Sequence, residues 1–92
     1  MATATIRIPT AFRSSTEGAT ELVVEAATVR DAVGQLTARY PSLTRQLVTT
    51  NGSLRNFVSV FVNGHNVRAL ERDATALSTG DVLTIVPAAA GG

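Results

Sequence analysis

Residues 57–64 decide the fold and read Phe57-Val58-Ser59-Val60-Phe61-Val62-Asn63-Gly64. The run of β-branched and aromatic residues predicts a strand over 57–62. Asn-Gly directly behind such a run is the strongest short signal for a type I′ hairpin, because both central residues of that turn need positive φ. A short return strand is therefore expected over 66–68.

Other segments alternate between apolar and polar residues and also predict strands. They span 3–8, 20–25 and 82–86. Turns are expected at 14–18 and 79–81, where Ser, Thr, Gly and Asp gather ahead of the second and third of these strands.

One helix is expected between the second and third strands. Thr28 and Asp31 have the spacing of a capping box, which places the helix N-terminus there. The apolar residues that follow recur at helical spacing and form one stripe, namely Val29, Ala32, Val33, Leu36 and Tyr40. Pro41 ends the helix, and the connection over 41–56 is expected to hold one short helical turn.

The resulting order is ββαββ, which predicts an α+β roll of the ubiquitin, or β-grasp, kind. We expect a mixed sheet of four to five strands with one main helix on one face. A split sandwich of another topology stays open. The folded domain is expected over 1–86, followed by a flexible tail over 87–92 that reads Pro87-Ala88-Ala89-Ala90-Gly91-Gly92.

Composition narrows the function. The chain has 92 residues, is 45% hydrophobic and 16% charged, and carries a formal net charge of +1. These values describe one globular domain and predict neither a nucleic-acid nor a membrane partner. The N-terminus lacks the pattern of a signal peptide, so a cytoplasmic location is expected. Cysteine is absent, which removes disulfides and thiol chemistry.

The sequence offers no catalytic or metal-binding constellation. His65 is the single histidine, and no Ser, Cys or carboxylate cluster accompanies it. The acidic residues are scattered without metal-ligand spacing. We therefore expect neither a catalytic residue nor a metal or cofactor bound by this chain.

Spaced motifs resemble the ubiquitin-like sulfur carriers of the MoaD/ThiS superfamily. They are a V-N-x-x-x-V hairpin over 62–67, an L-x-x-G-D-x-L-x-I-x-P pattern over 77–87, and the terminal Gly91-Gly92. The stretches over 6–10 and 54–58 most resemble the actinobacterial carriers of the cysteine-biosynthesis route.

The resemblance implies a protein co-substrate rather than an enzyme. An E1-like adenylyl/sulfurtransferase of the MoeB/ThiF type would use ATP and its own metal to adenylate the Gly92 carboxylate. Sulfur would then displace AMP and leave a thiocarboxylate, while Gly91 and Ala90 thread the partner's channel. A cysteine synthase that depends on pyridoxal phosphate would accept the sulfur, and a metallopeptidase would release cysteine.

Other functions stay open. The chain could be the small subunit of molybdopterin synthase, or a thio-donor for a specialised metabolite. It could also be a ubiquitin-fold interaction module that binds its partner without covalent chemistry, in which case Gly91-Gly92 is incidental.

A partner-binding face is expected on the sheet, opposite the helix. Alternation turns the valines of 58–62 toward the core. It turns outward Phe57, Ser59 and Phe61, beside Val82, Thr84 and Val86 of the last strand and near Arg7. Exposed aromatic and aliphatic residues on a small domain mark a partner site. This face also adjoins the strand that leads into the tail.

Overall fold

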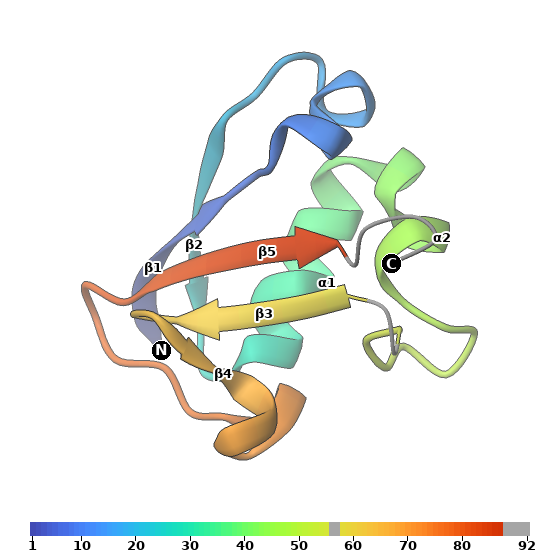
Figure 1. The fold of residues 1–92 in the computed structure, drawn as a ribbon. Coiled ribbons are helices and arrows are strands. Elements are labelled where there is room, and N and C mark those ends of the chain that lie inside the picture. The colour runs from blue at the N-terminus through green and yellow to red at the C-terminus, as the bar shows by residue number, and fades with distance from the viewer. Residues whose placement is uncertain (56–57, 88–92) are drawn as a thin grey trace.

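The structure is a computed structural model that describes residues 1–55 and 58–87. Its strands form one mixed sheet in the order β2-β1-β5-β3-β4 (Figure 1). β1 and β5 are parallel, and the other neighbouring pairs are antiparallel. The strands are β1 (Ala2–Arg7), β2 (Glu21–Ala26), β3 (Val58–Val62), β4 (His65–Asn66) and β5 (Val82–Pro87).

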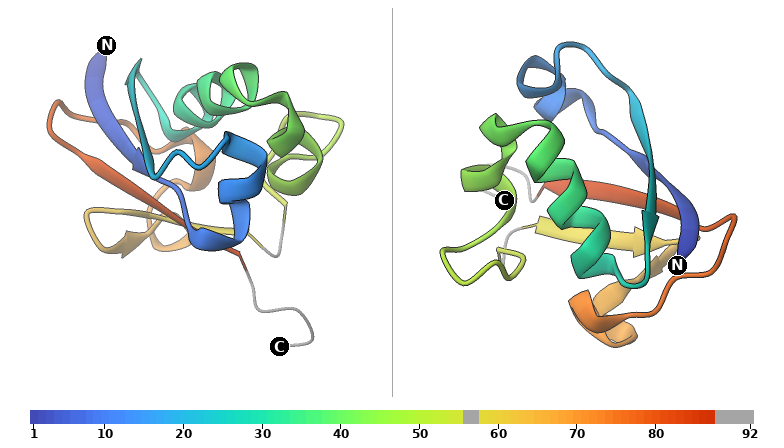
Figure 2. Two further views of the ribbon diagram at one scale, coloured as in Figure 1. Left: turned by 90° about the horizontal axis from the view of Figure 1, so that it is seen from above. Right: turned by 180° about the vertical axis from the view of Figure 1, so that it is seen from behind.

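The main helix, α1 (Val29–Arg39), lies across one face of this sheet (Figure 2, right). This confirms the predicted β-grasp architecture, with a mixed sheet and one main helix on one face. β1 begins and ends one residue before the strand predicted over 3–8, and β2 begins and ends one residue after the strand predicted over 20–25. β5 continues through Pro87, so strand pairing extends one residue past the predicted domain end at 86.

The capping box begins α1 as the sequence predicts. The Asp31 N–H donates to Thr28 Oγ1 at 3.2 Å, and the Ala27 N–H donates to Asp31 Oδ2 at 3.3 Å. The pair thus satisfies the Asp31 N–H, one of the donors that the first helical turn leaves without partners, and also the N–H of Ala27, one residue before the N-cap. Beyond α1, Pro41 begins the short helix η2 (Pro41–Leu43), which is followed by α2 (Thr44–Leu47).

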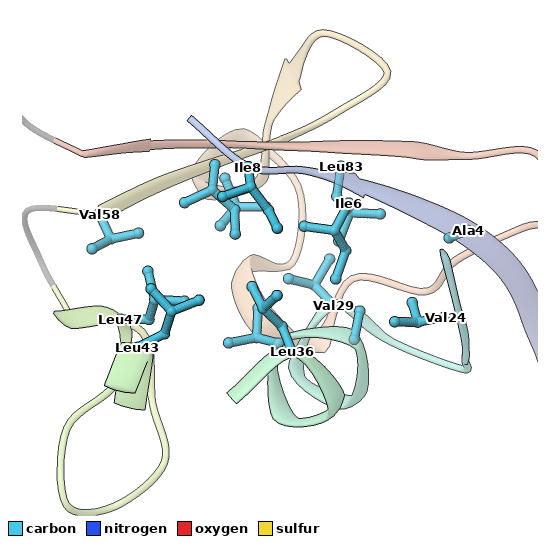
Figure 3. Packing of buried hydrophobic residues seen from close by; sticks show 14 of the residues in the cluster. Ala4, Ile6, Ile8, Val24, Val29, Leu36, Leu43, Leu47, Val58 and Leu83 are labelled. Atoms are coloured by element: carbon cyan, nitrogen blue, oxygen red, sulfur yellow. The ribbon is translucent and has the colours of Figure 1, made fainter. Parts of the chain in front are cut away.

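The core lies between α1 and the inner face of the sheet (Figure 3). Leu36 of α1 is fully buried against it, and Leu43 and Leu47 close the end beside α2. The strands contribute alternate residues, including Ala4, Ile6, Val24, Val58, Val60, Val62, Leu83 and Ile85. The valines of β3 therefore face the core, as predicted from alternation.

The β3–β4 hairpin has the predicted type I′ geometry, with φ of 51° at Asn63 and 87° at Gly64. The return strand was predicted over 66–68, but it begins one residue earlier and is shorter. β4 ends at Asn66, and Val67 begins the short helix η3 (Val67–Ala69). The cause is local, because Asn66 Oδ1 accepts a hydrogen bond from the Arg68 N–H at 2.9 Å and caps η3.

The segment before β2 also differs from the prediction. Instead of a turn over 14–18, the chain forms the 3-10 helix η1 (Thr10–Thr16), and the turn is confined to Glu17 and Gly18. Phe12 is buried and holds η1 on the core. A further 3-10 helix, η4 (Arg72–Ala74), precedes β5. No helix in the described part of the chain is long and apolar enough to cross a membrane.

Candidate functional site: the root of the C-terminal segment

Asn63 of the V-N motif and Asp81 of the G-D motif fix the start of β5 by hydrogen bonds. Asn63 Nδ2 donates to Asp81 Oδ1 at 2.8 Å, and Asn63 Oδ1 accepts from the Val82 N–H at 2.9 Å. The second Asp81 oxygen accepts from the Ser78 N–H at 2.8 Å. The V-N and G-D motifs therefore join the β3–β4 hairpin to the turn ahead of β5. Their role in this structure is to fix that strand.

β5 lies in the middle of the sheet, and this position determines where the C-terminal segment, residues 88–92, begins. It pairs with β1 through Thr5–Val82 to Arg7–Thr84, and with β3 through Val62–Leu83 to Val58–Pro87. β5 thus has neighbours on both sides up to Thr84, and Pro87 is paired with Val58 of β3. The predicted modification site Gly92 and the predicted threading residues Gly91 and Ala90 lie outside the described residues.

The outer face of the sheet brings together the described residues of the predicted partner-binding set. Register places Phe61, Thr84 and Arg7 in one row across β3, β5 and β1. Ser59 and Val86 form the next row toward the end of β5. Val86 is 42% exposed and Arg7 is exposed, while Ser59, Phe61, Val82 and Thr84 are partly buried. Phe57 lies outside the described residues.

This face continues beyond the predicted set toward β2. Val82 lies beside Thr5, and Thr5 lies beside Val23, which is 63% exposed. The result is a mixed apolar and polar surface opposite α1. Such a surface can bind a protein partner, and it adjoins the point at which the described chain ends.

A shallow groove of about 290 Å³ lies at the end of β5. Its floor is apolar, and its lining includes two cationic side chains, Arg7 of β1 and Arg13 of η1. The lining residues are Arg7, Ile8, Pro9, Arg13, Thr84, Ile85, Val86 and Pro87. Figure 2 (left) shows η1 beside the end of β5. Arg13 was not predicted as a site residue, because the sequence predicts a turn over 14–18, directly after it, and gives no direction for its side chain.

The described residues hold no group of three His, Cys, Asp or Glu side chains that could bind a metal. His65 is exposed in the two-residue strand β4. The chemically distinctive features of the described chain are therefore the outer face and the groove at the root of the C-terminal segment.

Comparisons with known proteins agree with this geometry. The chain is 36% identical over 90 residues to the sulfur carrier protein CysO of Mycobacterium tuberculosis, covering 96% of this chain and 97% of that protein. It superposes with a TM-score of 0.87 on the crystal structure of the Amycolatopsis orientalis BexX/CysO complex, at 34% identity, covering 97% of this chain and 99% of the matched one.

The fold is shared more widely. The solution structure of small archaeal modifier protein 1 from Methanosarcina acetivorans superposes with a TM-score of 0.88 at 27% identity, and the match covers 100% of this chain and 98% of that one. The ThiS family model matches residues 6–92, which include both motifs and Gly91-Gly92. The chain therefore belongs to the ThiS family, within the MoaD/ThiS superfamily of ubiquitin-like proteins.

Proposed function

We propose that this protein is a sulfur carrier whose C-terminal carboxylate at Gly92 is converted to a thiocarboxylate. The observation that carries the proposal is near-full-length similarity to a CysO sulfur carrier, together with a family match that runs through Gly91-Gly92. The fold supports it, because β5 lies between β1 and β3 and its pairing with β3 runs to Pro87, the last described residue before the C-terminal segment.

The proposed chemistry takes place at the terminal carbonyl carbon. A carboxylate oxygen attacks the α-phosphorus of ATP and pyrophosphate leaves, which gives an acyl-adenylate. Hydrosulfide then attacks the acyl carbon and AMP leaves, which gives the thiocarboxylate. A sulfur anion is a far better nucleophile than the original carboxylate oxygen. ATP and metal belong to an E1-like activating enzyme of the MoeB/ThiF type.

In this proposal the carrier is a co-substrate and contributes positioning. A folded domain docked by its outer face holds the reactive sulfur at high effective concentration in the partner's site. Glycine at 91 and 92 and alanine at 90 keep the threaded segment narrow, because they place no bulky side chain in the partner's channel.

The proposed acceptor is a cysteine synthase that depends on pyridoxal phosphate, with a metallopeptidase that releases the finished cysteine. The name of the CysO relatives supports this assignment. A thio-donor for another metabolite is the second candidate. The observation behind this candidate is the Amycolatopsis orientalis structure, in which CysO forms a complex with the protein BexX.

Intact-mass measurement tests the carrier function. The protein is expressed with the activating enzyme from the same genome and a sulfide source, and we expect the mass gain of one sulfur replacing one oxygen. Deleting Gly92, or adding one residue after it, should abolish this gain, because the reactive carboxylate is moved relative to the nucleotide site. Both variants should unfold at the temperature of the parent protein. Normal conversion of the extended variant would contradict the proposal.

Incubation with candidate acceptors distinguishes the two metabolic assignments. The thiocarboxylated protein is mixed with cysteine synthases of the same organism and their activated amino-acid substrates. A cysteinyl adduct on Gly92 supports the first assignment. If thiocarboxylate forms but no synthase yields the adduct, the cysteine assignment is wrong and the carrier function stands.

A further inference from the structure

The groove at the end of β5 contains a cationic group without a partner. Arg13 is partly buried, and its Nε is a buried side-chain nitrogen with no hydrogen-bond partner. A buried donor left unpaired destabilises a folded protein, so such a group calls for an explanation. A ligand that completes this hydrogen bond would remove the cost.

Hydrogen bonds and buried neighbouring residues fix the backbone around Arg13. The Arg13 carbonyl accepts from the Gly18 N–H at 2.8 Å and from Thr16 Oγ1 at 3.2 Å. Phe12 and Thr16, on either side of it, are buried in the domain. The backbone from which the Arg13 side chain extends is therefore fixed beside the groove by the turn that ends η1.

Arg7 adds a second cation to the same groove. Glu21 stands opposite Arg7 on β2, but no ion pair within 4.0 Å joins these two residues. No acidic side chain is among the described residues that line the groove. The groove thus combines two positive charges with an apolar floor formed by Ile85, Val86 and Pro87.

We propose that Arg7 and Arg13 form a carboxylate clamp that receives an acidic side chain of the protein that binds the C-terminal segment. A guanidinium binds a carboxylate side-on through Nε–H and one terminal N–H. The Nε of Arg13 is unpaired but buried in the unbound protein, so in this proposal the side chain turns toward the groove as the partner docks, and Nε–H becomes one of the two donors. The inference rests on the proposed function, and it names the chemistry by which a partner recognises the root of that segment.

The position of the clamp supports a partner as the occupant. The groove is continuous with the outer face through Thr84 and Val86, and it includes Pro87, the last described residue. A protein that binds the residues directly after Pro87 would lie close to this groove. Charge complementarity there would speed encounter and fix the orientation of docking more than it raises affinity.

A titration with acetate tests the clamp without any partner. The Arg13 Nε–H resonance is followed by NMR, with acetamide as the uncharged control. We expect a saturable shift with acetate alone that weakens in Arg7→Met. No shift, or equal shifts with both compounds, would overturn the proposal. So would a change of this resonance on deleting residues 88–92, because the chain's own terminus would then be the occupant.

Steady-state kinetics with the activating enzyme tests the partner. Arg7→Met and Arg13→Met should each raise KM for the carrier about tenfold at low salt and leave kcat unchanged, with the difference shrinking as salt rises. Arg13→Lys keeps the positive charge but loses the paired N–H donors of the guanidinium. Its KM should therefore lie between the values for the parent protein and for Arg13→Met. Arg39→Met, an exposed arginine at the end of α1, is the matched control. Thermal unfolding shows that each variant is folded.

Equal KM for all variants at low salt would overturn the clamp even if every variant is thiocarboxylated. If the unaltered protein is never activated by the enzyme, the proposed function fails instead. The acetate titration then still decides whether Arg7 and Arg13 bind a carboxylate.

Discussion

Asn63 joins two elements with one side chain. Its carboxamide donates to Asp81 and accepts from the backbone of Val82, and its φ of 51° suits the hairpin. Asn adopts positive φ more readily than most non-glycine residues. The residue type at this position is therefore chosen by backbone geometry and by hydrogen bonding together.

We expect Asn63→Ala to destabilise the fold by about 1–3 kcal/mol, because it removes both hydrogen bonds and places Ala in a left-handed conformation. Urea unfolding measures the change. Asn51→Ala is the control, since the hydrogen bond there uses the Asn51 backbone oxygen. Equal stability of the two variants would mean that the hydrogen bonds of Asn63 ahead of β5 contribute nothing to the free energy of unfolding.

At the scale of the element, β3 divides its residues between two roles. Val60 is fully buried, whereas the next residue, Phe61, is partly buried on the outer face. A single strand thus supplies both the core and the surface that we propose for docking.

Phe61→Ala should weaken binding to the activating enzyme by about 1–3 kcal/mol and leave the free energy of unfolding nearly unchanged. Val60→Ala should do the reverse, with a loss of stability of about 2 kcal/mol or more from the core. Calorimetric titration and urea unfolding of both variants measure the two effects. A large loss of stability in Phe61→Ala would show that this side chain belongs to the core.

Elements with a regular period could be predicted from the sequence, and irregular ones could not. The alternation of 58–62 and the stripe of α1 predicted which residues are buried. Asn66 ended β4 early through a side-chain cap, which competes with strand pairing without leaving a periodic trace. Phe12 and Arg13 sit on a 3-10 helix whose short span carries no amphipathic pattern. The outer face was therefore foreseeable, and the groove beside it was not.

At the scale of the whole molecule, the core extends from the sheet to the connection after α1. Leu47 of α2 is fully buried in it, whereas Leu70, after η3, is 45% exposed. Leu47→Ala should cost about 2–5 kcal/mol of unfolding free energy. Leu70→Ala should change it by less than about 0.5 kcal/mol. Thermal or urea unfolding of the pair checks whether α2 belongs to the cooperative unit.

The parallel pairing of β1 with β5 has a mechanical consequence. These strands lie at the two ends of the sequence, side by side and pointing the same way. Tension applied between the N-terminus and the C-terminus slides one strand along the other, so it loads their hydrogen bonds in shear and all at once. Bonds loaded together resist far more force than bonds opened one after another. Tension between the two termini is therefore resisted by the whole β1–β5 pairing before the domain yields.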